Sequence, residues 1–137
     1  MKNNIAQLLF QKFQLLDACL LEKLEKSKFG PISKAQSMIF ATLGQDDMTI
    51  SDIAKKLGIS RQAAQRTISE LTNKKLLTLK SSTKNKSAKI VVLTPTGSEC
   101  VRLAQKTYQE LERNISQVIG PPKLSELRAA LESDWKL

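Results

Sequence analysis

Residues 48–97 read MTISDIAKKLGISRQAAQRTISELTNKKLLTLKSSTKNKSAKIVVLTPTG and begin with a pattern that predicts two short helices joined by a tight turn. Thr49 can cap the first helix, with Asp52 three residues later as the reciprocal acid of a capping box. Gly58 can end that helix, because glycine adopts a left-handed backbone at little cost. Ser60 can then cap the second helix. The spacing therefore predicts a helix-turn-helix.

The second of these helices has two chemically different faces. Ala64, Ile68 and Leu71 recur at i, i+4 and i+7, which turns one apolar face to a core. Cations, amides and a hydroxyl occupy the other face, namely Arg61, Gln62, Gln65, Arg66 and Ser69. Such groups contact phosphates and read base edges in DNA. The plainer alternative is a solvated helix face.

A β-hairpin with a lysine-rich tip follows the second helix. Residues 76–80 alternate in polarity, and residues 89–93 are rich in β-branched side chains, so both segments suit strands. Residues 81–88 between them are mainly small and polar, with two lysines at the tip. Residues 48–50 are a candidate for a further short strand. A helix-turn-helix followed by a basic hairpin is a winged helix, so the predicted fold is mostly α with a small β-hairpin wing.

Amphipathic helices flank the winged region. In residues 4–26 apolar side chains recur at steps of three and four, and two further leucines widen the stripe beyond what one neighbouring helix covers. Thr94 can cap a helix with Pro95 at its first position, and a heptad-like seam then runs to Ile119. A last helix is expected over residues 123–133. Apolar surface in excess at both ends of the chain favours a homodimer over a monomer.

Positive charge is concentrated in the winged region. The 137 residues include 22 Lys/Arg and 13 Asp/Glu, a net charge of +9. Residues 45–94 hold 10 of the basic residues against 4 acidic ones, whereas residues 95–137 hold 6 of each. This asymmetry favours a polyanion bound by one part of the surface.

The composition argues against an enzyme. The chain has no histidine, which removes Ser-His and Cys-His nucleophiles and the commonest zinc ligand. We therefore expect no catalytic activity, no cofactor and no bound metal. The sequence contains no signal peptide and no apolar run that could span a membrane, so a cytoplasmic protein is expected. Cys19 and Cys100 are predicted to be small buried side chains, with a redox switch as the alternative.

Two segments carry a more specific pattern. The order I-A-K-K-L-G-I-S-R (53–61), the leucines at 71, 76 and 77, and then V-V-L-T-P-T-G (91–97) resembles the MarR family of bacterial transcription regulators. The resemblance implies a dimer held by the terminal helices, with recognition helices in successive major grooves and wings at the adjacent minor grooves. It also implies a single MarR-like domain over 1–137, made of an N-terminal dimerisation helix (1–30), a winged helix-turn-helix (31–94) and C-terminal dimerisation helices (95–137).

The resemblance also implies where DNA is bound. The family's DNA-binding positions on the recognition helix correspond to residues of this chain, and we add the rest of the polar face and the wing lysines. The predicted DNA-binding residues are then Ser60, Arg61, Gln62, Gln65, Arg66, Ser69, Lys84, Lys86 and Lys89. Either Arg61 or Arg66 could bind guanine, and either Gln62 or Gln65 could pair with adenine.

Two positions depart from the family pattern. Family members commonly carry an Asp-x-Arg motif in the wing, but the matching residues here are Asn85, Lys86 and Ser87. Lysine is a more hydrated point charge than arginine, so the wing is expected to contribute affinity more than sequence reading. Lys75 stands where the family usually has a glycine, which predicts a strained or differently shaped turn.

These patterns predict a homodimeric regulator, a repressor in the leading interpretation, that binds a pseudo-palindromic operator in double-stranded DNA. One alternative is a winged-helix scaffold that binds protein without an effector, and another is a cysteine-based redox-responsive regulator. Many relatives respond to a small aromatic acid in a crevice between the dimerisation and DNA-binding parts. This chain has few aromatic residues to line such a pocket, so a small-molecule effector is left unassigned.

Overall fold

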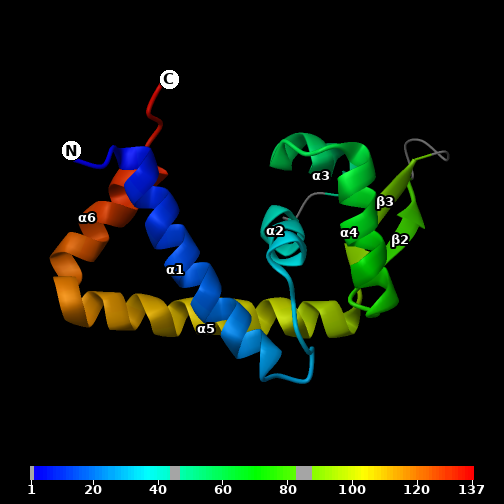
Figure 1. Ribbon diagram of the computed structural model, residues 1–137, viewed down its shortest axis with the longest axis horizontal. Helices are drawn as coiled ribbons and strands as arrows, with labels where there is room; N and C mark the ends of the chain where they lie inside the picture. The colour runs from blue at the N-terminus through cyan, green and yellow to red at the C-terminus, as the bar shows by residue number, and fades with distance from the viewer. Residues whose placement is uncertain (1, 44–46, 83–87) are drawn as a thin grey trace.

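The structure, a computed structural model, describes residues 2–43, 47–82 and 88–137. Six helices and three strands follow one another along these residues (Figure 1). They are α1 (Ile5–Glu25), α2 (Lys34–Thr42), β1 (Met48–Thr49), α3 (Ile50–Leu57), α4 (Arg61–Asn73), β2 (Leu77–Ser81), β3 (Lys89–Leu93), α5 (Pro95–Ile119) and α6 (Pro121–Glu132). The fold is mostly helical with a small antiparallel sheet, which confirms the predicted fold class.

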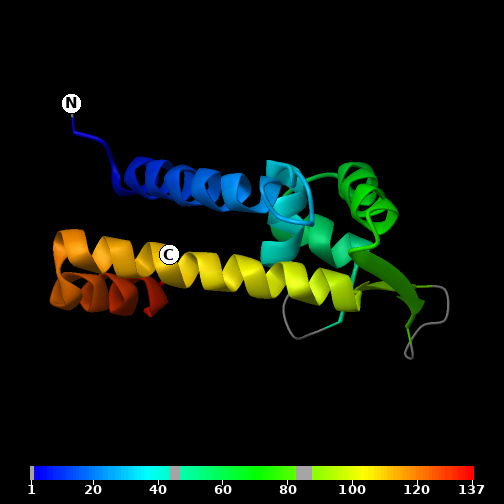
Figure 2. The ribbon, with the colours of Figure 1, turned by 90° about the horizontal axis from the view of Figure 1, so that it is seen from below.

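The elements form a winged lobe at one end and a group of long helices at the other. Helices α2, α3 and α4 and the sheet make the winged lobe, and α5 runs from its edge to the far end of the molecule (Figures 1 and 2). Helix α1 packs against α5 and α2, and α6 turns back against α5. Both chain termini lie at the end away from the wing (Figure 1). The lobe is thus attached through the C-terminal end of α1 and the beginning of α5.

Capping side chains set where the helices begin. Thr49 accepts a hydrogen bond from the Asp52 backbone N–H, and the Asp52 carboxylate accepts one from the Thr49 N–H, which completes the predicted capping box. Ser60 caps α4 and Thr94 caps α5, both as predicted. Gly58 has φ 66° at the end of α3, where a left-handed residue is needed. These local signals fix the turn between α3 and α4.

The sheet joins the helix-turn-helix to the hairpin. Its strand order is β1-β3-β2, with both pairs antiparallel. Met48 pairs with Val91, and Leu77 pairs with Leu93, so the hairpin returns to the base of α3. The candidate strand at residues 48–50 is present as β1 over Met48–Thr49, whereas Ile50 is the first residue of α3. Val91 is buried, which fixes the face that β3 turns to the helices.

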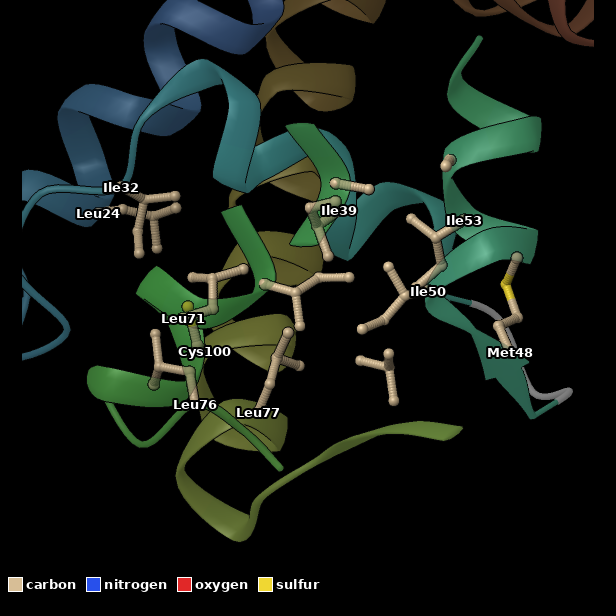
Figure 3. Packing of buried hydrophobic residues seen from close by; sticks show 14 of the residues in the cluster. Leu24, Ile32, Ile39, Met48, Ile50, Ile53, Leu71, Leu76, Leu77 and Cys100 are labelled. Carbon is tan, nitrogen blue, oxygen red and sulfur yellow. The ribbon is translucent and has the colours of Figure 1, made fainter. Parts of the chain in front are cut away.

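The core lies inside the winged lobe and extends into both long helices. Ile39 of α2, Ile53 of α3 and the α4 residues Ile68 and Leu71 are almost inaccessible to solvent, together with Leu77 of β2 (Figure 3). Leu20 and Leu24 join this cluster from α1, and Cys100 joins it from α5. Because the same cluster includes residues of α1 and α5, the lobe and the ends of the long helices form one packed unit.

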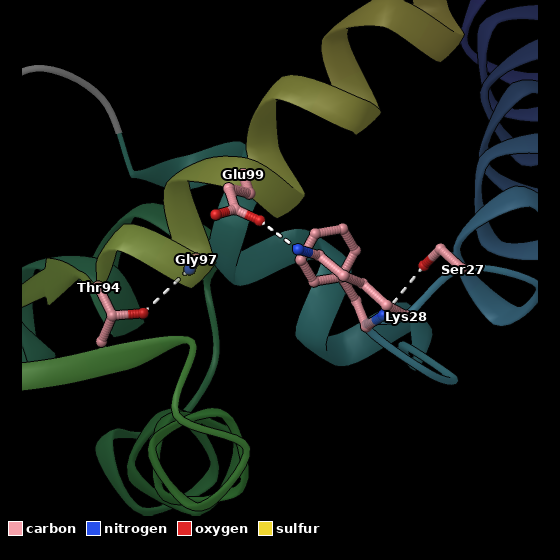
Figure 4. Close-up of polar contacts among 6 residues, drawn as sticks. Ser27, Lys28, Thr94, Gly97 and Glu99 are labelled. Carbon is pink, nitrogen blue, oxygen red and sulfur yellow. Dashed lines mark hydrogen bonds and ion pairs between the residues drawn. The ribbon is translucent and has the colours of Figure 1, made fainter.

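The segment Leu93–Gly97 forms a compact joint between the wing and α5. The Thr94 hydroxyl accepts a hydrogen bond from the Gly97 N–H at 2.9 Å (Figure 4). The same hydroxyl donates to the Lys75 carbonyl at 2.6 Å. The Thr94 N–H donates to the Leu76 carbonyl at 3.1 Å. A Cβ atom on Gly97 would overlap that same Leu76 carbonyl. Thr94 and Gly97 therefore hold the beginning of α5 against the chain that leaves α4.

Some boundaries differ from those expected. Strand β2 begins at Leu77 rather than at residue 76, because the Leu76 N–H donates to the Leu71 carbonyl and still belongs to the turn after α4. Helix α6 begins at Pro121 rather than at residue 123. Two prolines are tolerated there because the first N–H groups of a helix have no partner within the helix.

Candidate nucleic-acid interface

The two faces of α4 are those that its sequence predicted. Ala64, Ile68 and Leu71 are buried, and Thr67 joins them on the core side. The predicted DNA-binding residues of this helix are all exposed, namely Arg61, Gln62, Gln65, Arg66 and Ser69. The structure thus brings the six candidates from Ser60 to Ser69 together on and beside one accessible helix surface.

Ser60 caps the N-terminus of α4. Its hydroxyl accepts a hydrogen bond from the Ala63 N–H at 3.0 Å, which satisfies one of the donors at the beginning of α4. The side chain is exposed, so the hydroxyl can still donate its own hydrogen outward.

Arg61 is held by a residue that sequence reasoning missed. Its Nε donates to the hydroxyl of Ser51, on the neighbouring helix α3, at 3.1 Å. Both side chains are exposed. Ser51 lies between the two capping-box residues, and this polar position on α3 is the signal that could have drawn attention to it. The pairing itself crosses the turn and depends on the angle between two helices.

The exposed face of α4 is divided into a central stripe and a flank. Gln62, Arg66 and Ser69 follow at i, i+4 and i+7, and therefore lie one above another along the helix. Arg61 and Gln65 are also four residues apart, and they form a second row. Since successive residues are about 100° apart around the axis, the second row faces sideways from the first.

The wing adds further cations. Lys89 is exposed on β3, and its Nζ donates to the Ser81 hydroxyl of β2 at 3.2 Å. Lys80 is exposed on β2, opposite Ile90, and was not among the predicted residues. Lys84 and Lys86 lie outside the described residues. The ends of β2 and β3 next to the wing tip therefore present at least two lysine side chains.

Helix α3 carries both signs of charge close to α4. Lys55 and Lys56 are exposed in its last turn, where cations interact favourably with the helix dipole. Hydrogen bonds from Thr49, the backbone N–H first and the hydroxyl second, lower the pKa of Asp52. Asp52 is therefore ionised at neutral pH at the opposite end of the helix.

Polar contacts connect the segment between α1 and α2 to α4 and α5. Lys28 donates to a carboxylate oxygen of Glu99, in the first turns of α5, at 2.5 Å (Figure 4). The hydrogen bond from Lys28, followed by its charge, lowers the pKa of Glu99. Lys74 donates to the Pro31 carbonyl at 2.6 Å and to Gln36 at 2.9 Å. These contacts restrain the end of α4 relative to the long helices.

A cavity of about 250 Å³ lies where α1, α2 and α5 meet. Its lining is mainly apolar and includes Leu20, Phe40, Cys100, Ala104 and Tyr108. Burial raises the pKa of the Cys100 thiol, and burial likewise raises the pKa of the Tyr108 hydroxyl. The reactive thiolate form of Cys100 is therefore disfavoured. Cys19, which is half-buried, is also a free thiol.

The end of the molecule away from the wing exposes many large apolar side chains. On α1, Ile5 is 63% exposed and Phe10 is 60% exposed, and Val118 on α5 is 84% exposed. Leu8, Leu9, Phe13, Leu15, Ile119, Leu127, Leu131 and Trp135 are exposed on the same group of helices or just beyond it. Large apolar side chains left exposed in such numbers indicate an interaction site in a folded protein.

The described residues include neither a membrane-spanning helix nor a metal-binding cluster. No helix there is long and apolar enough to cross a membrane. The same residues contain no cluster of three or more acidic or cysteine side chains that could hold a metal ion.

The comparisons with known proteins point to one family. The model of the MarR family matches residues 31–86. The apo form of MarR from E. coli is similar in structure, with a TM-score of 0.76 and 20% identity over 96% of this chain and 97% of that chain. MepR, a transcription regulator of the Staphylococcus aureus multidrug efflux pump MepA, has a TM-score of 0.71 and 21% identity over 94% of each chain.

A variant of S. aureus MepR bound to an oligodeoxyribonucleotide has the same fold, with a TM-score of 0.64 and 21% identity over 95% of this chain and 94% of that chain. No curated protein sequence matches significantly. The predicted resemblance to MarR proteins and the predicted winged-helix fold are thus confirmed.

Proposed function

We propose that this chain, which has the fold of MarR proteins and matches the model of the MarR family over residues 31–86, is a sequence-specific regulator of transcription that binds double-stranded DNA. It acts as a homodimer, and repression is the proposed outcome of binding. Residues 1–30 and 95–137 serve dimerisation, and residues 31–94 bind DNA in the cytoplasm.

The observation that carries this proposal is the accessible polar surface of α4 beside a basic wing. A helix with one buried face and an opposite face of arginine, glutamine and serine has the donors needed at base edges in a major groove. Lys80 and Lys89 lie at the ends of β2 and β3 next to the wing tip, where phosphates or the minor groove would be contacted. The excess of basic over acidic residues in the winged region supports the same assignment.

The homodimer is supported by the apolar surface at the other end of the molecule. A second copy of the chain would cover the exposed side chains of α1 and of the α5–α6 region. A two-fold axis at this end would turn two α4 helices toward one face of a duplex. In such an arrangement the half-site centres of the operator are about one helical turn apart, near 10 bp.

Selection of bound sequences from random duplex DNA tests the proposal most directly. We expect an enriched pseudo-palindrome with half-sites spaced as above, together with a sedimentation mass of two chains. Affinity for it should fall steeply between low and moderate salt, as counterions are released from the phosphates. Weak binding with little salt dependence would instead indicate a scaffold for protein contacts, and a single-chain mass would contradict the dimeric mechanism.

Arg66 supplies a sharper test of the α4 assignment. Its guanidinium makes no hydrogen bond or ion pair within the described part of the chain, and it lies in the central stripe of the exposed face. We expect Arg66→Ala to cost about 1–3 kcal/mol of discrimination at one base pair of each half-site. Competition between the selected operator and single-base variants of it measures this loss.

The matched control for that variant is Lys84→Ala with Lys86→Ala in the wing. These changes should weaken all duplexes about equally and should lower the salt dependence. If Arg66→Ala remained dimeric and kept the base preference of the native protein, the assignment of base recognition to α4 would be wrong.

A further inference from the structure

Arg61 and Arg66 stand in different surroundings although both are exposed on α4. Arg61 is the first residue of the helix, and its Nε donates to the Ser51 hydroxyl of α3 at 3.1 Å. Arg66 lies more than one turn later, in the row that also contains Gln62 and Ser69. Arg61 thus leans sideways toward α3, whereas Arg66 projects with the central stripe.

The Ser51 hydroxyl is available for this contact because the capping of α3 is complete without it. Thr49 and Asp52 satisfy each other's backbone N–H groups at 3.0 and 3.1 Å. Ser51 lies between them in the sequence, at the second position of the helix. Its hydroxyl accepts from Arg61 across the turn, and no capping bond has to be broken for it to do so.

The bond determines which part of the guanidinium remains for a ligand. Arginine has five N–H donors in a planar fork, and the Nε–H is one of them. With that donor engaged by Ser51, the two terminal amino groups remain free to bind two oxygens of one anion. A side chain that is already held loses less rotational freedom when its ligand arrives.

We propose that Ser51 is a positioning residue that holds Arg61 against α3, so that the terminal amino groups of Arg61 bind a phosphate of the DNA backbone. This inference rests on the proposed function. In a helix-turn-helix the first helix crosses the backbone while the second enters the groove, so an arginine tied to α3 is directed to phosphate. Base reading then belongs to Gln62, Arg66 and Ser69 in the central stripe.

A double-mutant cycle of Ser51→Ala and Arg61→Ala tests the proposal on the full-length dimer. Affinity for the selected operator and for an unrelated duplex is measured at several salt concentrations. We expect Ser51→Ala to weaken both duplexes by about three- to tenfold, the effect of one net hydrogen bond, with no change in base preference. Since no charge is removed, the slope of log affinity against log salt should stay the same.

Arg61→Ala should weaken both duplexes and lower that slope by about one, because one phosphate contact is lost. In the Arg61→Ala background, Ser51→Ala should have no further effect. Ser51→Thr, which keeps the hydroxyl, should restore the affinity of the native protein. Circular dichroism with thermal unfolding checks that each variant is folded, and sedimentation checks that each remains dimeric.

Three results would overturn the inference. One is an equal loss from Ser51→Ala in both backgrounds, since a merely structural role of Ser51 predicts additivity. Another is a change of base preference in Arg61→Ala, which would make Arg61 a base-reading residue. The third is full affinity in Ser51→Ala. All three require that the native protein binds DNA, so they differ from failure of the proposed function, in which the native chain selects no sequence at all.

Discussion

A side chain on Gly97 has no room at the beginning of α5. The position has no unusual φ, so its constraint is steric: a Cβ there would overlap the Leu76 carbonyl oxygen. That oxygen also accepts a hydrogen bond from the Thr94 N–H. Because glycine has no Cβ, α5 can begin directly against the chain that leaves α4. A larger residue at this position must displace either α5 or that chain.

We expect Gly97→Ala to lower the free energy of unfolding by about 1–3 kcal/mol, the usual cost of forcing extra volume into a packed site. Urea denaturation measures the change. Ser98→Ala, at the next position of the helix, is the matched control and should stay within about 0.5 kcal/mol. Equal stability of Gly97→Ala and the native protein would show that α5 can move away from the Leu76 carbonyl without loss of folding free energy.

At the scale of the elements, local signals predicted the fold well and long-range contacts could not be predicted. The caps Thr49, Ser60 and Thr94 act on donors three residues away, so their function can be read from the sequence. Lys75 confirms the expected unusual turn, with φ 63° where a glycine would be unstrained. The contact of Arg61 with Ser51 depends on how two helices pack, which no local pattern encodes.

The contact between Lys28 and α5 predicts a dependence on pH. The pKa of Glu99 is lowered in the folded protein, so the pair contributes stability above the ordinary pKa of glutamate, about 4.3. That contribution is lost as the pH falls through the lowered value. We expect Glu99→Gln to reduce the thermal midpoint slightly at pH 7, and we expect this difference to shrink as the pH falls below the ordinary pKa of glutamate.

Both carboxylate and lysine are exposed, so high salt should also reduce the difference at pH 7. Glu126→Gln on α6 serves as the control for removal of an exposed carboxylate. A Glu99→Gln effect that grows as the pH falls would contradict the proposed contact.

At the scale of the whole molecule, the sequence predicted an excess of apolar surface but could not say which residues a single chain would cover. The C-terminal part of α1 lies in the core through Leu20 and Leu24, while Ile5 and Phe10 in its N-terminal part remain exposed. A periodic apolar stripe in the sequence predicts only that one face of the helix is buried. Whether the partner is another helix of the chain or a second copy depends on the tertiary arrangement.

We expect Phe10→Glu to shift the proposed dimer to a monomer, because a carboxylate in an apolar interface is left without a partner. Analytical ultracentrifugation measures the shift, and operator binding should weaken with it. Glu22→Gln, on the exposed surface of the same helix, is the control and should remain dimeric. A dimeric Phe10→Glu protein would place the interface elsewhere.

Helix α5 is a single helix of 25 residues that begins at the wing and ends beside the exposed apolar surface. At about 1.5 Å per residue it is about 37 Å long. Because Thr94 joins the first turn of α5 to the end of α4, a change in the tilt of α5 moves the wing with it. A tilt of about 10° at the far end would swing the wing by about 6 Å, close to the rise of two base pairs.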